Sequence, residues 1–385
     1  MKDSANGFDF DETVDRSGTS SLKWDLYRDS DVLPLWVADT DFKSPPPVIE
    51  ALHERVDHGV FGYTLPPREL VAEVQGHLQR SFGWTVPEEW LVWLPGLVSG
   101  LSLCCRAFAR PGEAVLTTTP VYPPFLKCPP AMERELQTAP LVRSNDRWEF
   151  DWDAFEAAID QRTRLFLFCS PHNPCGRIWD EAELTRLVDI CERRDLVLCS
   201  DEIHNQLLLD AAPHRPTGMI APEAAARTVT LMAPSKTYNI AGLACSYAII
   251  PDSSLRRRFR RATAMIIPHV NLLGFTAALA SYRHGAPWLK AQLAYLRQGR
   301  DLIEEAVADM PRVSMTHVEA TYLAWLDCRE LGLAETAAHF EEHGLGFQAG
   351  RDFGLPGFMR WNFGTTHANT RAALDRFRRA CEAAE

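Results

Sequence analysis

Short apolar runs alternate with amphipathic stretches through the middle of the chain. Each apolar run is followed by polar or turn-forming residues, as is typical of buried strands, and the runs occupy residues 114–118, 164–169, 196–200, 228–233 and 244–250. Helical periodicity separates several of them; in residues 180–194, for example, Leu184, Leu187 and Cys191 share one face. This alternation predicts an α/β fold with a mostly parallel sheet covered by helices.

The C-terminal third has a different pattern. Residues 288–310 show a long helical period, residues 321–326 form an apolar run typical of a strand, and residues 370–384 have the pattern of a final amphipathic helix. We therefore expect an N-terminal segment packed on a smaller α+β domain, a large α/β domain, and the smaller domain itself, at residues 1–45, 46–285 and 286–385.

Composition and charge exclude some classes of function. The 385 residues are 46% hydrophobic and 24% charged, which is ordinary for a soluble globular protein. The 51 acidic residues outnumber the 40 basic ones and give a net charge of −11, which disfavours nucleic acid or an anionic membrane as the main partner. An anionic ligand would need a local positive site. No run approaches the ~18 apolar residues of a membrane span.

The start of the chain and its cysteines indicate a compartment. The first residues, MKDSANGFDFDETVDR, are polar and acidic and lack the apolar core of a secretory signal. The ten cysteines include the adjacent pair Cys104 and Cys105, form no CxxC motif, and mostly have apolar neighbours. In a chain of this length we expect them to be reduced, buried thiols, and we expect the protein to be cytoplasmic.

Polar segments follow several of the predicted strands. They read LPG, CSPHNPCGR, SDEIH and APSKTYN, at residues 94–96, 169–177, 200–204 and 233–239. Because the carboxyl ends of parallel strands meet at one edge of a sheet, these loops should converge on one site. Each segment alone has an ordinary explanation: a surface lysine, a turn, a helix-capping Asp, or a glycine in a tight turn. Their joint occurrence at strand ends is what indicates a function.

The motifs SPHNPCG, SDEIH and PSKTYNIAGL together resemble the fold-type I, aspartate-aminotransferase-like enzymes that use pyridoxal 5′-phosphate (PLP). More narrowly they resemble the cystathionine β-lyase branch of the MalY/PatB type. The resemblance covers most of the chain through WVADTDFKSPPPV, FGYT, TPVYPPF, EATYLAWLD and MRWNFG, which begin at residues 36, 61, 119, 319 and 359. It implies a PLP-dependent transferase fold with a seven-stranded type of sheet, and a homodimer with shared active sites.

The resemblance places five residues around the ring of the cofactor. Lys236 would hold PLP as a Schiff base, and its freed amine would remove the α proton of the substrate. Asp201 would keep the pyridine nitrogen protonated, because the ring withdraws electrons well only in that form. Asn173 and His204 would lie beside the phenolic oxygen, and Tyr122 would stack on the ring. The alternative for His204 is a hydrogen-bonded core position, and for Tyr122 it is ordinary packing.

The phosphate of the cofactor needs donors or cations. Gly96, Leu97 and Val98 open a predicted helix whose first amides can face it, and Ser235 can add a hydroxyl. Tyr63 resembles a tyrosine that reaches the phosphate from the neighbouring subunit, and we expect it to be catalytic together with the lysine and the aspartate. Ordinary packing is the alternative for Tyr63.

The expected partner is a small amino-acid substrate. Arg360 of MRWNFG matches the arginine that binds its α-carboxylate, a role for which a guanidinium is suited, although a surface role is the alternative. Asp39 and Asn173 are further expected substrate contacts, and no metal is expected. Two features are discounted: RRRFRR at 256–261 is interpreted as a solvated helix face, and Cys175 as a spectator thiol.

The resemblance to this branch implies carbon–sulfur β-elimination. A cysteine S-conjugate would lose its sulfur substituent as a thiol, for which a pKa of ~8.5 makes a fair leaving group, and would yield pyruvate and ammonia. The chain departs from the family pattern in GLACS at 242–246, where many relatives carry a phosphate-binding arginine, in Thr40 of WVADTDF, commonly a methionine, and in GTTHANT at 364–370. The last two lie on the presumed substrate side and suggest a bulkier biosynthetic conjugate than cystathionine.

Other functions stay open. The same residues would support an aminotransferase, or decarboxylation or oxidative deamination of a cysteine S-conjugate. A DNA-binding regulator on this fold would need a further N-terminal domain, which does not fit before Trp36 in an acidic chain. A protein-interaction role on the same fold would not require an intact Lys236.

Overall fold

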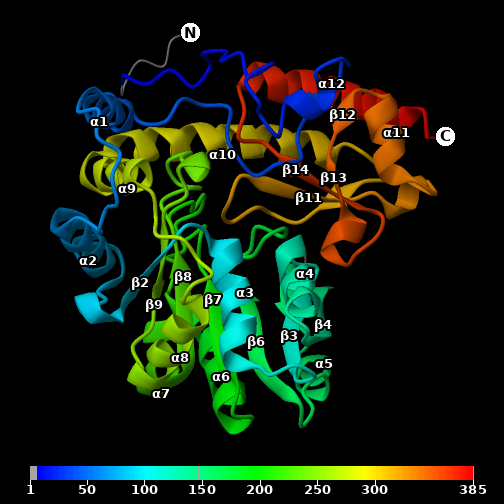
Figure 1. Cartoon of the computed structure of the whole chain (residues 1–385). Helices are drawn as coiled ribbons and strands as arrows, with labels where there is room; N and C mark the ends of the chain where they lie inside the picture. Colours follow the sequence, from blue (N-terminus) through cyan, green and yellow to red (C-terminus); the bar gives the residue numbers. More distant parts are fainter. Residues whose placement is uncertain (1–6, 145–146, 385) are drawn as a thin grey trace.

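The computed structural model describes residues 7–144 and 147–384. Its central sheet fills the lower part of Figure 1 and has the strand order β2–β9–β8–β7–β6–β3–β4–β5. In chain order these strands are β2 (Leu91–Leu94), β3 (Ala114–Thr119), β4 (Glu135–Ser144), β5 (Arg147–Phe150), β6 (Thr163–Cys169), β7 (Val197–Asp201), β8 (Thr228–Met232) and β9 (Ser246–Ile249).

The sheet is mostly parallel, as predicted. Pairs β8/β7, β7/β6, β6/β3 and β3/β4 are parallel, whereas β9 is antiparallel to both β8 and β2, and β5 is antiparallel to β4. The sheet exceeds the expected seven-stranded type by one strand, because the hairpin of β4 and β5 adds an edge strand.

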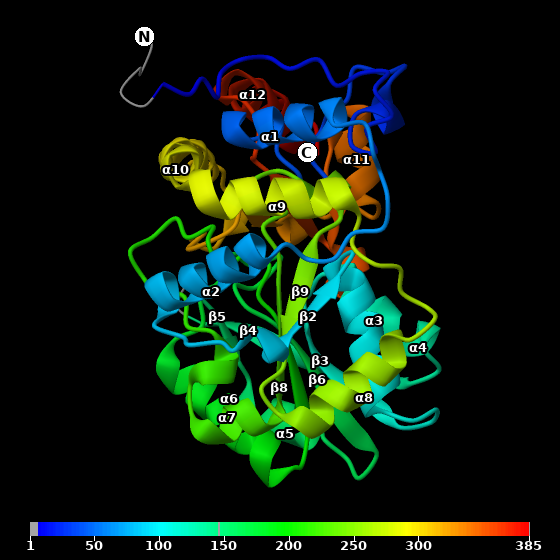
Figure 2. The same cartoon turned by 60° about the vertical axis from the view of Figure 1, so that its left-hand side comes forward.

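Burial on both faces explains why the central strands are continuous apolar runs. In β6, Leu165 and Leu167 pack in one core cluster, while Phe166 and Phe168 pack in another on the opposite face. Figure 2 shows helices on both sides of the sheet. One face is covered by α3 (Leu97–Phe108), α4 (Pro123–Ala131) and α8 (Ser253–Thr263), and the other by α2 (Arg68–Phe82), α5 (Trp152–Ala157), α6 (Glu181–Arg193), α7 (Pro222–Arg227) and α9 (Leu272–His284).

Helix α6 illustrates how the sequence specifies these helices. Asp180 caps it by accepting from the Glu183 amide at 2.9 Å, and the Glu183 side chain accepts in return from the Asp180 amide at 2.8 Å. Leu184, Leu187 and Cys191 are buried on one face, so the predicted helix over residues 180–194 is confirmed.

A second layer lies above the central sheet in Figure 1. Its antiparallel sheet has the order β10–β11–β14–β13, and the helices here are α1, α10, α11 and α12. Their bounds are β10 (Ser314–Met315), β11 (Leu323–Asp327), β13 (Gln348–Ala349), β14 (Phe358–Asn362), α1 (Pro46–Asp57), α10 (Ala286–Ala308), α11 (Thr336–Glu342) and α12 (His367–Glu382). The helix predicted over residues 288–310 and the strand predicted over residues 321–326 are confirmed as α10 and β11, with bounds shifted by a residue or two. The last helix begins earlier than predicted because Thr366 caps it by accepting from the Asn369 amide.

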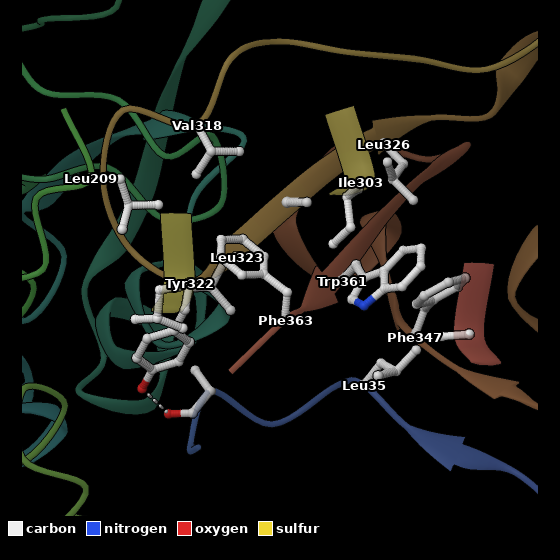
Figure 3. Close-up of a cluster of buried hydrophobic side chains, with 14 of the residues drawn as sticks. Leu35, Leu209, Ile303, Val318, Tyr322, Leu323, Leu326, Phe347, Trp361 and Phe363 are labelled. Carbon is white, nitrogen blue, oxygen red and sulfur yellow. Dashed lines mark hydrogen bonds between the residues drawn. The ribbon is translucent and has the colours of Figure 1, made fainter. Parts of the chain in front are cut away.

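The N-terminal segment joins this upper layer. Its strand β1 (Leu33–Pro34) pairs in parallel with β12 (Leu345–Gly346). Figure 3 shows Leu35 beside Phe347 and Trp361 in the buried cluster of the layer. This packing agrees with the expectation that the N-terminal segment packs on the smaller domain, while the exact division of the chain into domains stays a prediction.

The basic run RRRFRR lies on α8. Leu255, Phe259 and Ala262 are buried, while Arg257 and Arg261 are exposed, so the run is a solvated helix face as interpreted from the sequence. Within the described ranges, no helix is long and apolar enough to cross a membrane.

The His317 imidazole connects the upper layer to a loop of the lower one. Its Nδ1 lies 2.9 Å from Glu304 Oε2 on α10, and its Nε2 lies 2.9 Å from Asp210 Oδ2. The hydrogen bond with Glu304, aided by both carboxylates, raises the pKa of His317 from 6.5 to about 9. Since the pKa is higher in the folded state, this stabilisation is fully present below pH 6.5 and is lost as the pH rises through about 9.

We therefore expect His317→Gln to lower the free energy of unfolding near neutral pH and to have no effect at about pH 10. The difference should be about 1 kcal/mol or less, because the imidazole is half exposed and its ion pairs are screened. Urea unfolding at several pH values measures it, with His53→Gln on the exposed side of α1 as the matched control. A deficit that persists unchanged at pH 10 would contradict the assignment.

Candidate active site

Several loops meet at the carboxyl edge of the central sheet. They follow β2, β6, β7 and β8, which all run in the same direction because β9 is antiparallel to both of its neighbours. Asn173 follows β6, Asp201 ends β7, Lys236 follows β8, and Gly96 lies between β2 and α3. The structure thus brings together the segments that the sequence predicted to converge.

The amine of Lys236 meets a carbonyl of the N-terminal segment. Its Nζ donates to the Ala38 carbonyl at 2.5 Å, and the Tyr322 hydroxyl donates to the same oxygen at 3.0 Å, the bond drawn in Figure 3. Removal from water lowers the pKa of Lys236 to about 8, opposed by the Asp39 carboxylate and reinforced by Arg360. An amine with this pKa can serve as nucleophile and base near neutral pH.

Asp201 is a buried carboxylate, 5% exposed. Its Oδ1 accepts from the Ile203 amide at 3.1 Å, and no described lysine or arginine forms an ion pair with it. Burial raises the pKa of Asp201 to about 7 against this hydrogen bond, and Glu202 acts in the same direction as burial. A cation placed beside Asp201 would therefore find a strong partner.

The next residue, Glu202, is fully buried and fully paired. Its Oε1 accepts from the Ser200 hydroxyl at 2.8 Å and from the Thr217 amide at 2.9 Å, and its Oε2 lies 2.8 Å from His214 Nε2. This network behind Asp201 was not predicted from the sequence. A second acid in SDEIH was a usable signal for Glu202, whereas nothing in the sequence pointed to His214.

Arg360 reaches the same edge from β14 and is 1% exposed. Its Nη1 donates to Asn173 Oδ1 at 3.1 Å and its Nη2 to the Trp36 carbonyl at 2.5 Å, while Nε is buried without a partner among the described residues. Burial lowers the pKa of Arg360 to about 10, so it stays charged at neutral pH. Because Oδ1 of Asn173 is taken, its Nδ2 is the atom left to donate to a ligand.

His204 is buried between the two layers. Its ring lies edge-on to Tyr322 with centroids 6.3 Å apart, and its Nδ1 has no partner among the described residues. Burial lowers the pKa of His204 to about 3, and the cations of Lys236 and Arg360 add to the shift. The imidazole is therefore neutral at neutral pH and can donate or accept one hydrogen bond at each nitrogen.

Tyr122 and the start of α3 complete the edge. The Tyr122 amide donates to the Asn173 carbonyl at 3.0 Å, which places this residue against the Asn173 turn. Gly96 caps α3, and the space where its Cβ would lie is open. Leu97 is buried and Val98 exposed, so their backbone amides rather than their side chains are available to an anion.

Other expected residues lie differently. Ser235 is part-exposed beside the lysine, and Tyr63 is fully exposed, at 107%, so its expected role depends on a second copy of the chain. The Asp39 carboxylate pairs with Arg16, and its role as a substrate contact stays a prediction. Cys175 is buried, and burial raises the pKa of its thiol well above the usual value, as suits a spectator.

The two departures from the family pattern that were expected on the substrate side, Thr40 and GTTHANT at 364–370, lie next to each other only in part. Thr40 is buried, and a Cβ added to Gly364 would lie 2.8 Å from its Cγ2. Two later residues of GTTHANT pack elsewhere: His367 stacks on Tyr295 with centroids 3.7 Å apart, and Thr366 caps α12. Helix capping and ring packing account for these two residues, and the substrate-side role of the motif stays a prediction.

The arrangement fits PLP. Asp201 would face the pyridine nitrogen, Asn173 and His204 the phenolic oxygen, and the first amides of α3 the phosphate, with Lys236 as the covalent attachment. The unpartnered His204 Nδ1 and Arg360 Nε are buried polar atoms whose missing partners a cofactor and a carboxylate substrate would supply.

Comparisons with known proteins agree with this geometry. A family model described as "Aminotransferase class I and II" matches residues 30–377. The chain is 36% identical over 383 residues to cystathionine beta-lyase PatB of Bacillus subtilis (strain 168), covering 96% of this chain and 99% of that protein. The crystal structure of OvoB superposes with a TM-score of 0.95 at 43% identity, covering 97% of this chain and 99% of that one. Cystalysin from Treponema denticola, whose crystal structure contains PLP, gives a TM-score of 0.94 at 32% identity, with 98% and 100% covered.

We expect Asp201→Asn to stabilise the protein in its cofactor-free form at about pH 8. Since burial raises the pKa of Asp201 from 3.8 to about 7, the folded state is penalised for an ionised Asp201 above pH 7, and the penalty vanishes below 3.8. Thermal unfolding should show a Tm about 2 °C higher in the variant at pH 8, with the gap closing as the pH falls toward 4. Asp153→Asn, at an exposed position of α5, is the control, and a lower Tm than wild type at pH 8 would refute the assignment.

Proposed function

The chain belongs to the aminotransferase class I and II family, and on that premise we propose that it is a PLP-dependent carbon–sulfur β-lyase. With one water consumed, it cleaves a cysteine S-conjugate to a thiol, pyruvate and ammonia. The observation that carries this proposal is the Lys236 amine, with its pKa lowered to about 8, in the electrostatic reach of buried Asp201 and buried Arg360. The similarity to a protein named cystathionine beta-lyase supports elimination as the outcome.

Each residue has a physical task in this reaction. PLP, when bound, supplies an electron sink that makes the α hydrogen of an amino acid acidic. Arg360 binds the α-carboxylate through its free Nε edge and so orients the α C–H bond. The Lys236 amine takes the α proton, and Asp201 holds a proton on the pyridine nitrogen. The C–S bond then breaks, its electron pair leaves on the sulfur, and the thiolate gains a proton. The three-carbon enamine that remains reacts with water to give pyruvate and ammonia.

We propose a conjugate bulkier than cystathionine, from a natural-product biosynthetic route. The support is Thr40, which stands where the branch commonly carries a methionine and whose side chain lies against Gly364. The side chain of threonine is shorter than that of methionine, so it leaves more room in the site for the sulfur substituent of the substrate. We also propose a cytoplasmic location, which is supported by ten free cysteines, most of them buried.

The second copy in the proposed homodimer would cover an apolar segment. Large apolar side chains that are at least half exposed lie near the end of α1 and in the connection from α1 to α2, namely Val56, Val60, Phe61, Tyr63 and Leu65. Exposed apolar clusters of this kind mark an interface in soluble proteins. In the homodimer Tyr63 would reach the phosphate site of the other subunit, so that each active site is shared.

The reaction is tested by product analysis. We expect cysteine S-conjugates, including cystathionine and bulkier ones, to give thiol, pyruvate and ammonia without any keto-acid acceptor. Lys236→Ala should abolish turnover, since it removes both the attachment and the base, whereas Lys290→Ala at an exposed site of α10 should retain wild-type rates. Borohydride reduction followed by peptide mapping should place the pyridoxyl group on Lys236.

The other outcomes of that assay identify other reactions. An absolute requirement for 2-oxoglutarate or pyruvate as acceptor would make the protein an aminotransferase. Release of carbon dioxide with an aldehyde product would show decarboxylative chemistry at the same α-carbon.

Sharing of sites is tested by complementation. Tyr63→Ala and Lys236→Ala homodimers should each be inactive or strongly impaired, but mixing them should restore about a quarter of wild-type activity if half the dimers are mixed and one site in each is intact. Dimer formation is measured by sedimentation, and subunit exchange by tagged chains. If exchange is complete and no activity returns, Tyr63 does not serve the partner's site.

A further inference from the structure

The N-terminal segment lies across the candidate site as a strap, which we define as residues 36–41. It lies between β1 and α1 and forms neither helix nor strand. The site residues Arg360 and Lys236 donate hydrogen bonds to the strap, as do Tyr322 and Asn362, which follows Arg360 on β14 by two positions. The carbonyls that accept from them are those of Trp36, Val37, Ala38 and Asp39.

Charged side chains make a second set of contacts with the strap. Arg16 Nη2 lies 2.7 Å from Asp39 Oδ2, and its Nη1 lies 2.8 Å from Asp41 Oδ1. Lys23 Nζ lies 3.0 Å from Asp41 Oδ2, and Trp24 Nε1 donates to Asp41 Oδ1 at 2.8 Å. We call these residues the clip. Lys23 is 0% and Asp41 6% exposed, so this ion pair is buried, and loss of Lys23 would leave Arg16 as the cation paired with Asp41.

A third set of bonds connects the strap to the loop of Lys236. Asn239 Oδ1 accepts from the Thr40 amide at 3.2 Å, and its Nδ2 donates to the carbonyls of Thr40 and Phe42 at 3.0 and 2.7 Å. The strap therefore has three sets of side-chain contacts but no regular backbone ladder of its own. A segment of this kind keeps its position only while those contacts persist.

We infer that Arg16 and Lys23 are positioning residues of the active site: through Asp39 and Asp41 they set the strap carbonyls against Arg360 and Lys236. The inference rests on the proposed function for its kinetic consequence. The Trp36 carbonyl helps to orient Arg360 toward a carboxylate. A loosened strap therefore misaligns the guanidinium and weakens substrate binding more than it slows the chemical step.

Binding of the substrate should therefore suffer more than the chemical step. Arg16→Met keeps an unbranched apolar stem but removes the guanidinium and its charge, and we expect it to raise KM about 10-fold while kcat changes less than about 3-fold. Arg16→Lys should recover part of the loss, because it restores a charge without the bidentate geometry. Arg28→Met is the control, since Arg28 is exposed in the same segment and forms no ion pair among the described residues.

Hydrogen exchange of the PLP-loaded enzyme tests the clip without reference to turnover. The Thr40 amide is bonded to Asn239 Oδ1 and the Asp41 amide to the Gly364 carbonyl, so both report the position of the strap. In Arg16→Met, peptides covering residues 36–44 should exchange about 10-fold faster, while peptides of β6 to β8 keep wild-type rates. Wild-type exchange in the strap, or equal acceleration throughout the chain, would overturn the inference.

Asp39→Asn separates the clip from direct contact of Asp39 with the substrate. If Asp39 acts through Arg16, Asp39→Asn raises KM and strap exchange in the same direction as Arg16→Met but by less, because Arg16 also pairs with Asp41, and the double variant is no worse than Arg16→Met. If Asp39 instead binds the substrate, Asp39→Asn raises KM while the strap exchanges as in wild type, and the clip is refuted. Should no S-conjugate be cleaved, the exchange rates still decide the inference, so its failure and that of the proposed function are distinguishable.

Discussion

Parallel backbone pairing of β6, β7 and β8 is the constraint on which the site depends. The register pairs Cys169 with Asp201, and Asp201 with Leu231, so the strands end at the same level of the sheet. Helices on both faces exclude water from these strands, and ligands of such sheets can enter only at the strand ends. Asn173, Asp201 and Lys236 are neighbours for this reason, although long segments of chain separate them.

Charge at this edge is arranged to receive a ligand. Burial shifts the pKa of Asp201 upward and those of Lys236 and Arg360 downward, each toward its neutral form. A cation bound at Asp201 and an anion bound at Arg360 would favour the charged forms of these two groups. A zwitterionic amino acid and a protonated pyridine ring provide that complement, and this is why the fold suits PLP chemistry on amino acids.

Parts of the chain far from the central sheet close the site. Arg360 comes from the antiparallel sheet of the upper layer, and the strap comes from the N-terminal segment. The clip and Asn239 make the strap's position depend on residues such as Arg16 and Lys23, which lie outside the set of site residues. Substrate binding can therefore be tuned in this protein without changing Lys236, Asp201 or Arg360.

The sequence by itself determined the central layers and singled out the residues that the structure brings together at one edge of the central sheet. Period-2 and period-3.6 patterns are local, as is the capping of α6, and the motifs after β6, β7 and β8 are contiguous in the chain. The tertiary structure alone decided the pairing of His214 with Glu202, the contacts of Arg16, and the packing of His367 on Tyr295. These contacts join residues between elements, and no local period or spacing encodes which partner a buried polar side chain will meet once the layers have packed.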